Sequence, residues 1–481
     1  MKKSLVKRNR TKILRDTARV ITRSHIPSAE RLPLIIERVL SLPEEQATLL
    51  LQQVYENFSD RHKNIETILQ HNFEKIVHYI PRDLEFSRTK ELLLGAYFTM
   101  EYSVESAALF NPSIVPHPNQ KDVPPGSLRF IMSLRATGEG HISSIVFRSG
   151  LIQEDGSILL NPASEFVGTP KIRHDQSYDR HLFRRKLKDM KAWNETSIRI
   201  FDKLPEQFTF KRLVHEIVDF QTSSEPNKDE TALRIIRWLA DSNYFIEFDG
   251  KNEISERVIF PVSENESKGI EDARFVQFFD EDGEVTYFAT YTAYNGICIL
   301  PQLLVTKDFI NFDIMTLNGK AVQNKGMALF PRKINGQYAM LSRQDGVNNY
   351  LMYSDNVHFW DEAQLLQEPQ RPWEFIQVGN CGSPIEIEEG WLVLTHGVGP
   401  MRQYCIGAML LDLNDPSKII ARLEEPLITP NEEEREGYVP NVVYSCGSLI
   451  NNNKLILPYA MSDITSGIAT VDMSELLGAM R

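Results

Sequence analysis

Two adjacent carboxylates and a nearby cation form the most chemically suggestive stretch of the sequence. Glu271 and Asp272 follow a glycine turn, and Arg274 lies two residues beyond Asp272. Successive side chains of an extended segment point to opposite faces, so Asp272 and Arg274 share a face if this segment is a strand. A carboxylate beside a cation at the end of a strand is a candidate acid or anion-binding site. A surface ion pair at a loop–strand junction explains the same residues equally well.

Other polar residues at the ends of apolar, strand-like runs could complete such a site. Taken singly each is a weak signal, because an Arg or Lys on a strand edge is usually solvated. The usual motifs of P-loop NTPases, zincins, α/β-hydrolases and dinucleotide-binding enzymes are missing from the sequence. The strand-end candidates are Asn111, Ser113, Arg135, His141, Ser143, Ser144, Lys325, Arg343, His396, Arg402, Tyr404, Glu436, Tyr459 and Asp463.

Composition excludes several classes of protein. A net charge of −12 over 481 residues argues against a general nucleic-acid binder, whose binding surface is basic. No run of 18 apolar residues occurs, so no membrane span is expected. The widely spaced cysteines Cys298, Cys381, Cys405 and Cys446 contain no CxxC pair. This usage favours reduced thiols in a cytoplasmic protein over a disulfide framework or a metal site, and no metal is expected.

The chain divides into a helical N-terminal extension, residues 1–83, and a strand-rich region, residues 84–481. Apolar residues at helical spacing predict helices between residues 30 and 80, and an oligomer contact is a reasonable role for them. The basic residues 1–15 are expected to form a solvated arm. Short apolar runs separated by turn residues follow from residue 84, which predicts a sandwich, barrel or propeller. Helical spacing returns at about 200–245 and predicts an inserted helical hairpin.

Eight motifs in a fixed order carry a family resemblance over about residues 100–475. Together they resemble glycoside hydrolase family 130, the β-mannoside phosphorylases and related β-1,2-mannosidases. The N-terminal helices and the insert are outside the shared core. The motifs are FNPS at 110–113, SLRA at 133–136, GIEDARF at 269–275, LFPRKINGQYAMLSR at 329–343, GNCGSPIEIEEGWLVLTHGV at 379–398, YCIGAMLLDLNDP at 404–416, EGYVPNVVYSCG at 436–447 and PYAMSDITSGIA at 458–469.

The resemblance implies an all-β core folded as a five-bladed β-propeller, with the site at one end of its central channel. It also implies an inverting reaction at a β-mannosidic bond, with Asp272 as the proton donor acting through a sugar hydroxyl. Ala273 stands where many members have proline, which is a minor departure. The implied phosphate ligands are Arg135, Lys325, Arg343, His396 and Tyr404. The expected substrate-binding residues are Asn111, Ser113, Ser143, Glu271, Arg274, Glu436, Tyr459 and Asp463.

The choice between phosphorolysis and hydrolysis depends on whether a second carboxylate or a set of cations lies beside the catalytic acid. An inverting hydrolase needs a second carboxylate as base, about 6.5–9.5 Å from the acid. A phosphorylase instead needs cations that hold phosphate, and Arg suits that role. The cationic set favours phosphorolysis to α-mannose 1-phosphate, with inorganic phosphate as co-substrate and no other cofactor. The alternatives are an inverting β-1,2-mannosidase, with Glu436 or Asp463 as base, and a non-catalytic glycan-binding propeller. A homo-oligomer acting on β-mannoside oligosaccharides is expected.

Overall fold

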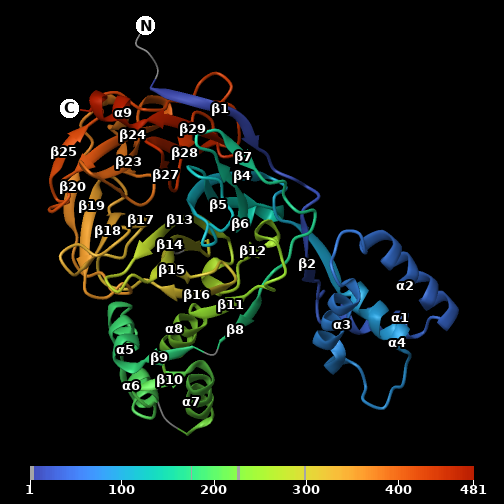
Figure 1. Ribbon diagram of the computed structural model, residues 1–481. Helices are drawn as coiled ribbons and strands as arrows, with labels where there is room; N and C mark the ends of the chain where they lie inside the picture. Colours follow the sequence, from blue (N-terminus) through green and yellow to red (C-terminus); the bar gives the residue numbers. More distant parts are fainter. Residues whose placement is uncertain (1–4, 175, 225–227, 297–298, 481) are drawn as a thin grey trace.

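Five antiparallel sheets, here called sheets I to V, make up most of the computed structural model (Figure 1). The structure describes residues 5–174, 176–224, 228–296 and 299–480. The predicted β-rich core is confirmed. Strand β23 shows why these segments are so apolar: all nine of its residues are buried. A strand covered on both faces reads as a continuous apolar run rather than as an alternating one.

The sheets follow one another along the chain. Sheet I contains β4 (Ala108–Pro116), β5 (Leu128–Thr137), β6 (Ser143–Ile152), β7 (Ile158–Leu160) and β12 (Val258–Ile259). Sheet II contains β8 (Lys171–Arg173), β11 (Tyr244–Glu247), β13 (Ile270–Phe279), β14 (Val285–Tyr294), β15 (Ile299–Thr306) and β16 (Asn311–Thr316). Sheet III contains β17 (Lys325–Leu329), β18 (Tyr338–Arg343), β19 (Asn349–Ser354) and β20 (Gln364–Gln367).

The last two sheets complete the β-rich body. Sheet IV contains β21 (Gln377–Asn380), β22 (Ile385–Ile387), β23 (Gly390–Val398), β24 (Tyr404–Leu411) and β25 (Ile419–Arg422). Sheet V contains β1 (Val6–Ile13), β26 (Val443–Tyr444), β27 (Leu449–Asn451), β28 (Lys454–Met461) and β29 (Thr465–Asp472). The final helix, α9 (Met473–Ala479), follows β29 directly.

The prediction of a solvated N-terminal arm was wrong for the described part of that segment. Strand β1 pairs antiparallel with β29, so the start of the chain adds a strand to the last sheet. Val6 and Ile13 are buried, and Arg8 forms a 2.8 Å ion pair with Glu434. The basic residues between the two apolar ends had hidden this strand, because they occupy mostly its more exposed positions.

Four helices form a separate bundle at the right of Figure 1. They are α1 (Arg31–Leu40), α2 (Glu44–Phe58), α3 (Ile65–Ile76) and α4 (Arg88–Tyr97). Because α4 packs on the other three, the bundle extends past the expected boundary at residue 83. Two short strands, β2 (Val20–Ser24) and β3 (Thr99–Ser103), pair with each other and connect the bundle to the sheets.

The helical insert is larger than the hairpin expected at residues 200–245. It contains β9 (Ser177–Asp179), α5 (Arg180–Asp189), α6 (Glu195–Phe201), β10 (Gln207–Thr209), α7 (Phe210–Thr222) and α8 (Glu230–Asp241). These elements share their own apolar core and lie at the bottom of Figure 1, between β8 and β11 in the chain. Helix α5 escaped prediction because seven of its ten residues are charged or His, and its buried apolar residues are only Phe183 and Leu187.

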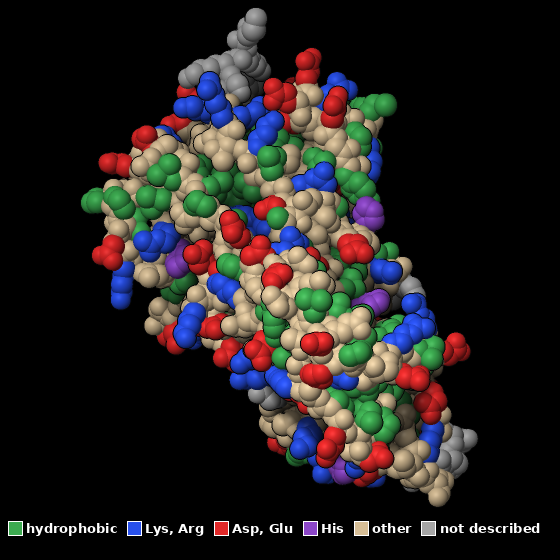
Figure 2. All heavy atoms as spheres, turned by 90° about the vertical axis from the view of Figure 1, so that its right-hand side faces the viewer, with side chains coloured by type: hydrophobic (Ala, Val, Ile, Leu, Met, Phe, Trp, Pro, Cys, Tyr) green, Lys and Arg blue, Asp and Glu red, His purple; other side chains and the backbone are tan. Residues whose placement is uncertain are grey.

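The described residues include no helix long and apolar enough to cross a membrane. Over that same part of the chain, no group of three or more His, Cys, Asp and Glu side chains could hold a metal ion. Cys381, Cys405 and Cys446 are buried free thiols, whereas Cys298 lies outside the described residues. Figure 2 shows acidic and basic side chains interspersed over one face of the molecule, without a broad basic area.

Candidate active site

A repeated backbone irregularity places polar side chains at one end of an edge strand in each of sheets I to III: β4, β13 and β17. The pairing register shifts after Phe110 in β4, after Glu271 in β13 and after Lys325 in β17. The residue that follows each shift has a left-handed backbone, with φ of 49° at Asn111, 55° at Asp272 and 89° at Gly326. Bulges of this kind redirect side chains, and left-handed residues other than glycine concentrate at functional sites.

These strand ends surround a polar pocket of about 150 Å³. All five sheets contribute to it, together with the loops before β24, before β26 and after β28. The residues that line the pocket are Asn111, Arg135, Asp272, Lys325, Arg343, Gln377, His396, Arg402, Tyr404, Val439, Val442, Tyr444 and Asp463.

Asp272 is the central carboxylate of this pocket. The Asn111 side-chain amide donates a 2.7 Å hydrogen bond to Asp272 Oδ1, and Arg135 Nη1 lies 3.4 Å from the same oxygen. Burial alone would raise the pKa of Asp272, but Arg135, Arg274 and Lys325 outweigh it and lower the pKa below its ordinary value. Asp272 is therefore a buried carboxylate held in its ionised form by surrounding cations.

Glu271 links two of these cations just beside the pocket. Its Oε1 accepts a 2.7 Å hydrogen bond from Arg135 Nη2, and its Oε2 lies 3.5 Å from Lys325 Nζ. Arg135 also lies over the ring of Phe110, with 5.1 Å between the guanidinium carbon and the ring centroid. Charge pairing and ring contact together hold the Arg135 guanidinium in place at the pocket wall.

His396 differs from the expected cation. Its Nδ1 lies 3.0 Å from the carbonyl oxygen of Asn380, and its Nε2 lies 3.1 Å from Arg343 Nη1. Burial, and then the charge of Arg343, lower the pKa of His396 well below its ordinary value. A neutral imidazole satisfies both contacts if Nδ1 donates to the carbonyl and Nε2 accepts from Arg343. His396 thus orients Arg343 rather than adding a charge.

Asp463 is a second carboxyl at the pocket wall, and its pKa is shifted in the opposite direction to that of Asp272. Burial, and then the negative charge of Asp272, raise the pKa of Asp463 to about 6. Two nearby carboxyls pushed to opposite sides of their ordinary pKa are typical of catalytic sites. Four cationic side chains line the same pocket: Arg135, Lys325, Arg343 and Arg402. Cations outnumber ionised carboxylates there, so the pocket is suited to an anion.

Comparison with known proteins agrees with this chemistry. A family model described as beta-1,4-mannooligosaccharide phosphorylase, that of glycoside hydrolase family 130, matches residues 234–481. The chain belongs to glycoside hydrolase family 130. A 1,2-beta-oligomannan phosphorylase of Thermoanaerobacter is 33% identical over 253 residues, which cover 50% of this chain and 81% of that protein. A beta-1,2-mannobiose phosphorylase of Listeria innocua is 33% identical over 226 residues, covering 46% of this chain and 62% of that protein.

A solved structure of family 130 also resembles this chain. The beta-1,2-mannobiose phosphorylase from Listeria innocua, in complex with β-1,2-mannobiose, is 22% identical with a TM-score of 0.47. The similarity covers 78% of this chain and 92% of that one.

All the residues predicted as phosphate ligands line the family 130 pocket, and so do Asp272, Asn111 and Asp463. Ser113 and Ser143, which were predicted to bind substrate, do not line the pocket. The Ser113 hydroxyl accepts a 3.0 Å hydrogen bond from the backbone N–H of Phe275, and Ser143 donates a 2.9 Å bond to the carbonyl of Ile270. These bonds tie sheet I to β13 on both sides of Asp272, so the serines position the acid rather than line the pocket.

Four further predicted substrate-binding residues also lie outside the pocket lining, among them Glu271, which pairs with Arg135 and Lys325. Arg274 is buried and donates a 2.6 Å hydrogen bond to the hydroxyl of Tyr444, which does line the pocket. Tyr459 is buried and donates a 2.7 Å bond to Glu434. Glu436 is exposed to solvent. The structure therefore makes Arg274 a positioning residue and gives no support to Glu436 as a ligand or a base.

Gln377 and Tyr444 line the pocket, although they were not among the predicted site residues, and Arg402, a strand-end candidate without an assigned role, lines it too. Gln377 Nε2 lies 3.5 Å from Tyr404 Oη and 3.5 Å from His396 Nε2. Arg402 and Tyr444 lie next to or within family motifs of the sequence, which is the signal that could have found them. Gln377 lies two residues ahead of such a motif, which is the same kind of signal.

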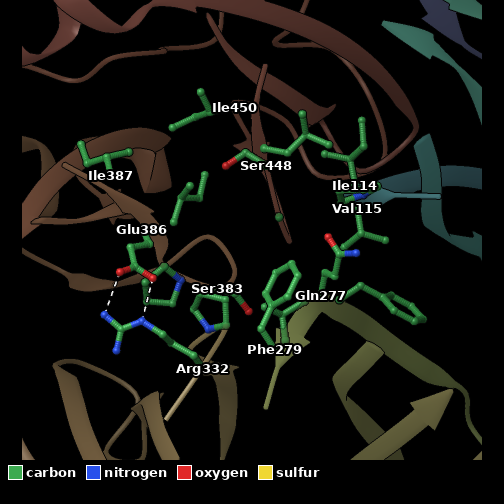
Figure 3. A pocket seen from close by; sticks show the side chains of 18 residues that line it. Ile114, Val115, Gln277, Phe279, Arg332, Ser383, Glu386, Ile387, Ser448 and Ile450 are labelled. Atoms are coloured by element: carbon green, nitrogen blue, oxygen red, sulfur yellow. Dashed lines mark hydrogen bonds and ion pairs between the residues drawn. The ribbon is translucent and has the colours of Figure 1, made fainter. Parts of the chain in front are cut away.

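A larger cavity of about 450 Å³ lies farther along several of the same strands (Figure 3). Apolar side chains such as Ile114, Phe279 and Ile450 dominate its lining. Arg332 is its one cation among the described residues, and Glu386 binds that guanidinium at 2.7 Å (dashed in Figure 3). This cavity lacks a cluster of cations around a buried carboxylate, so size does not identify the active site here.

Proposed function

We propose that this protein is an inverting β-mannoside phosphorylase that converts β-1,2-linked manno-oligosaccharides and inorganic phosphate into α-mannose 1-phosphate. The single observation that carries the proposal is the buried carboxylate Asp272 among Arg135, Lys325 and Arg343. A phosphorylase needs one acid and a phosphate cradle, and Arg is suited to bidentate phosphate binding. The β-1,2 linkage is supported by the names of the Thermoanaerobacter and Listeria innocua relatives.

The electrostatics of the pocket support a sequence of events. Phosphate binds between the cations, and its charge offsets the field that keeps the pKa of Asp272 low. The pKa of Asp272 then rises, so the carboxyl can carry the proton that the reaction needs. A phosphate oxygen attacks the anomeric carbon from the face opposite the glycosidic bond. That bond breaks, and the leaving oxygen receives the proton from Asp272, directly or through a sugar hydroxyl.

We also propose that sheets I to V are the blades of a five-bladed propeller whose axis ends in this pocket. Support comes from the contacts between sheets: β4 with β13, β13 with β17, β17 with β21, β24 with β26, and β28 with β4. This set of neighbours runs from each sheet to the next and returns to the first. Sheet V combines β1 with the last strands of the chain, so both ends of the chain meet in one sheet.

Hydrolysis is the second candidate, and Asp463 is the observation in its favour. Asp463 lines the same pocket as Asp272, and a carboxyl with a pKa of about 6 can act as a base near neutral pH. A hydrolase, however, does not need the set of cations around Asp272. A glycan-binding protein without activity would need neither the cations nor a buried acid.

Product analysis with and without phosphate tests the proposal. The purified protein would be incubated with β-1,2-mannobiose or β-1,4-mannobiose, and products would be separated by anion-exchange chromatography. We expect α-mannose 1-phosphate only when phosphate is present, with faster turnover of the β-1,2 disaccharide. Free mannose forming at the same rate in phosphate-free buffer would establish the hydrolase instead. Binding of the disaccharides without any turnover would favour the glycan-binding alternative.

A further inference from the structure

An exposed pair of stacked rings lies in two loops close to the candidate active site. The rings of Tyr438 and His141 have centroids 5.6 Å apart and an interplanar angle of 26°. Tyr438 is 67% exposed, although His141 covers one face of its ring. The other face of the ring is therefore open to solvent and available to a ligand.

The loop that carries Tyr438 is fixed beside the pocket carboxyl Asp463. The backbone N–H of Val439 donates a 3.1 Å hydrogen bond to the carbonyl of Ser462, and Val439 itself lines the pocket. A side chain at Gly437 would come within 2.5 Å of the same Ser462 carbonyl oxygen. Tyr438 thus lies between two residues whose backbone is fixed against Ser462, the residue before Asp463, in a loop that reaches the pocket lining through Val439.

The loop that carries His141 is fixed beside Asp272 in a similar way. The Tyr102 hydroxyl donates a 3.2 Å hydrogen bond to the carbonyl of Ile142, the residue after His141. The next residue, Ser143, donates to the carbonyl of Ile270, two positions before Asp272. The two loops are therefore anchored next to the two pocket carboxyls, one beside each, and their rings stack on each other.

We propose that Tyr438, supported by His141, is a sugar-binding platform for a unit of the oligosaccharide that projects out of the pocket. The proposal rests on the proposed phosphorolysis, because it assigns a place to the leaving part of a β-mannoside. The pocket holds about 150 Å³, well below the roughly 300–1,000 Å³ of sites that bury drug-sized ligands. Phosphate and the mannosyl unit under attack use that space and the first leaving unit lies at its mouth, so any further sugar unit must lie on the rim.

The chemistry of the open Tyr438 face suits a pyranose ring. One face of such a sugar presents C–H groups, while its hydroxyls stay in water around the edge. An aromatic ring offers a flat apolar surface at small entropic cost, and its hydroxyl remains solvated. The platform should therefore select for chain length: a trisaccharide can reach it with a unit that a disaccharide lacks.

The test compares β-1,2-mannobiose with β-1,2-mannotriose in the Tyr438→Ala variant. We expect kcat/KM for the trisaccharide to fall about tenfold, through KM, with a much smaller change for the disaccharide, since one aromatic contact is worth roughly a decade in binding. The KM for phosphate should not change, whereas a general structural defect would change it as well. Tyr438→Phe should restore most of the preference for the trisaccharide because it keeps the ring.

The chain offers a matched control in the helical bundle. Tyr79 is 49% exposed and packs on the ring of His78 with 4.0 Å between centroids, but it lies outside the pocket and its two loops. Tyr79→Ala should therefore leave both substrates unaffected. Equal losses for the two substrates in Tyr438→Ala would overturn the platform while leaving phosphorolysis intact.

Calorimetry separates the platform from the catalytic proposal. β-1,2-Mannotriose would be titrated into Asp272→Asn protein with and without Tyr438→Ala. Weaker binding of about tenfold in the double variant supports the platform even if the wild-type protein forms no mannose 1-phosphate. Unchanged affinity would overturn it, whatever the reaction turns out to be.

Discussion

The same strands form two very different surfaces in this protein. Strand β4 contributes Asn111 to the polar pocket and Ile114 to the apolar cavity, and β13 contributes Asp272 to the first and Phe279 to the second. The strands change character at their bulges, where the backbone turns left-handed. The polar pocket therefore combines strained backbone with buried charge, whereas the apolar cavity follows the regular pleat. Strain and unmatched charge of this kind indicate function, and regular apolar packing indicates stability.

The largest expected effect is the loss of the acid at the polar pocket. Asp272→Asn preserves shape but removes the proton source, so kcat should fall by about 10²–10⁴-fold. The matched change at the apolar cavity is Glu386→Gln, where the carboxylate only pairs with Arg332. Steady-state release of α-mannose 1-phosphate measures both. Near wild-type turnover in Asp272→Asn, or a comparable loss in Glu386→Gln, would contradict the distinction between the two surfaces.

The polar pocket could be predicted in large part because its residues fall within recognisable motifs. What the sequence could not give was the direction of each side chain. Ser113 and Ser143 lie in or beside the same strand ends as Asn111 and Arg135, yet both are used in bonds to β13. A bulge changes which residues face the pocket, and simple alternation along a strand does not reveal it. The neutral state of His396 likewise depends on burial and on Arg343.

Helices and strands could be predicted where apolar residues recur at regular spacing. They were missed where most residues of the element are polar or charged. The many short strands and the α1–α3 stripes were clear, but β1 and α5 carry few apolar residues among many basic ones. Both elements are held by tertiary packing, β1 against β29 and α5 within the insert. Local propensity is overridden in such cases. Assembly into a homo-oligomer and a cytoplasmic location stay predictions.

A second way to separate the two surfaces is to remove packing at the apolar cavity. Leu449 lines that cavity, is 7% exposed and belongs to an apolar core cluster. Leu449→Ala should lower the free energy of unfolding by about 2–3 kcal/mol, at the low end for Leu→Ala because one side already faces a cavity. Urea unfolding measures that loss, while the KM for phosphate should stay the same. A raised KM for phosphate with unchanged stability would assign a ligand role to the apolar cavity.

Truncating one arginine at each surface gives a smaller and more specific effect. Arg343 is buried in the polar pocket, and its loss should raise the KM for phosphate by about 10–100-fold, as expected for a hydrogen bond to a charged group. Arg332 is partly exposed at the apolar cavity and pairs with Glu386. Arg332→Ala should cost no more than about 1 kcal/mol of stability and leave the KM for phosphate unchanged. Phosphate titrations at saturating mannobiose measure the difference, and equal KM values in the two variants would contradict it.

The last expected effect is a pH dependence that exists only at the polar pocket. The pKa of Asp463 is raised from an ordinary 3.8 to about 6 by burial and by Asp272, so the folded protein holds this proton more tightly than the unfolded chain does. The stabilisation is complete below the ordinary pKa and is lost as pH rises through about 6. Asp463→Asn abolishes that loss. Relative to wild type, the variant should gain about 1–3 kcal/mol of unfolding free energy between roughly pH 4 and pH 8.

Asp272→Asn should show the opposite trend, because the pKa of Asp272 is lowered and its stabilisation disappears as pH falls. Urea unfolding from below the ordinary Asp pKa of 3.8 up to about pH 8, in buffer without phosphate, measures both variants against wild type. Phosphate must be absent because its binding would stabilise the folded state by mass action and mask the two carboxyls. Parallel stability curves for wild type and Asp463→Asn would show that Asp463 titrates as an ordinary surface acid. In that case Asp272 would be the only carboxyl of this pocket with a shifted pKa. Asp463 would then lose the property that makes it a candidate base for hydrolysis.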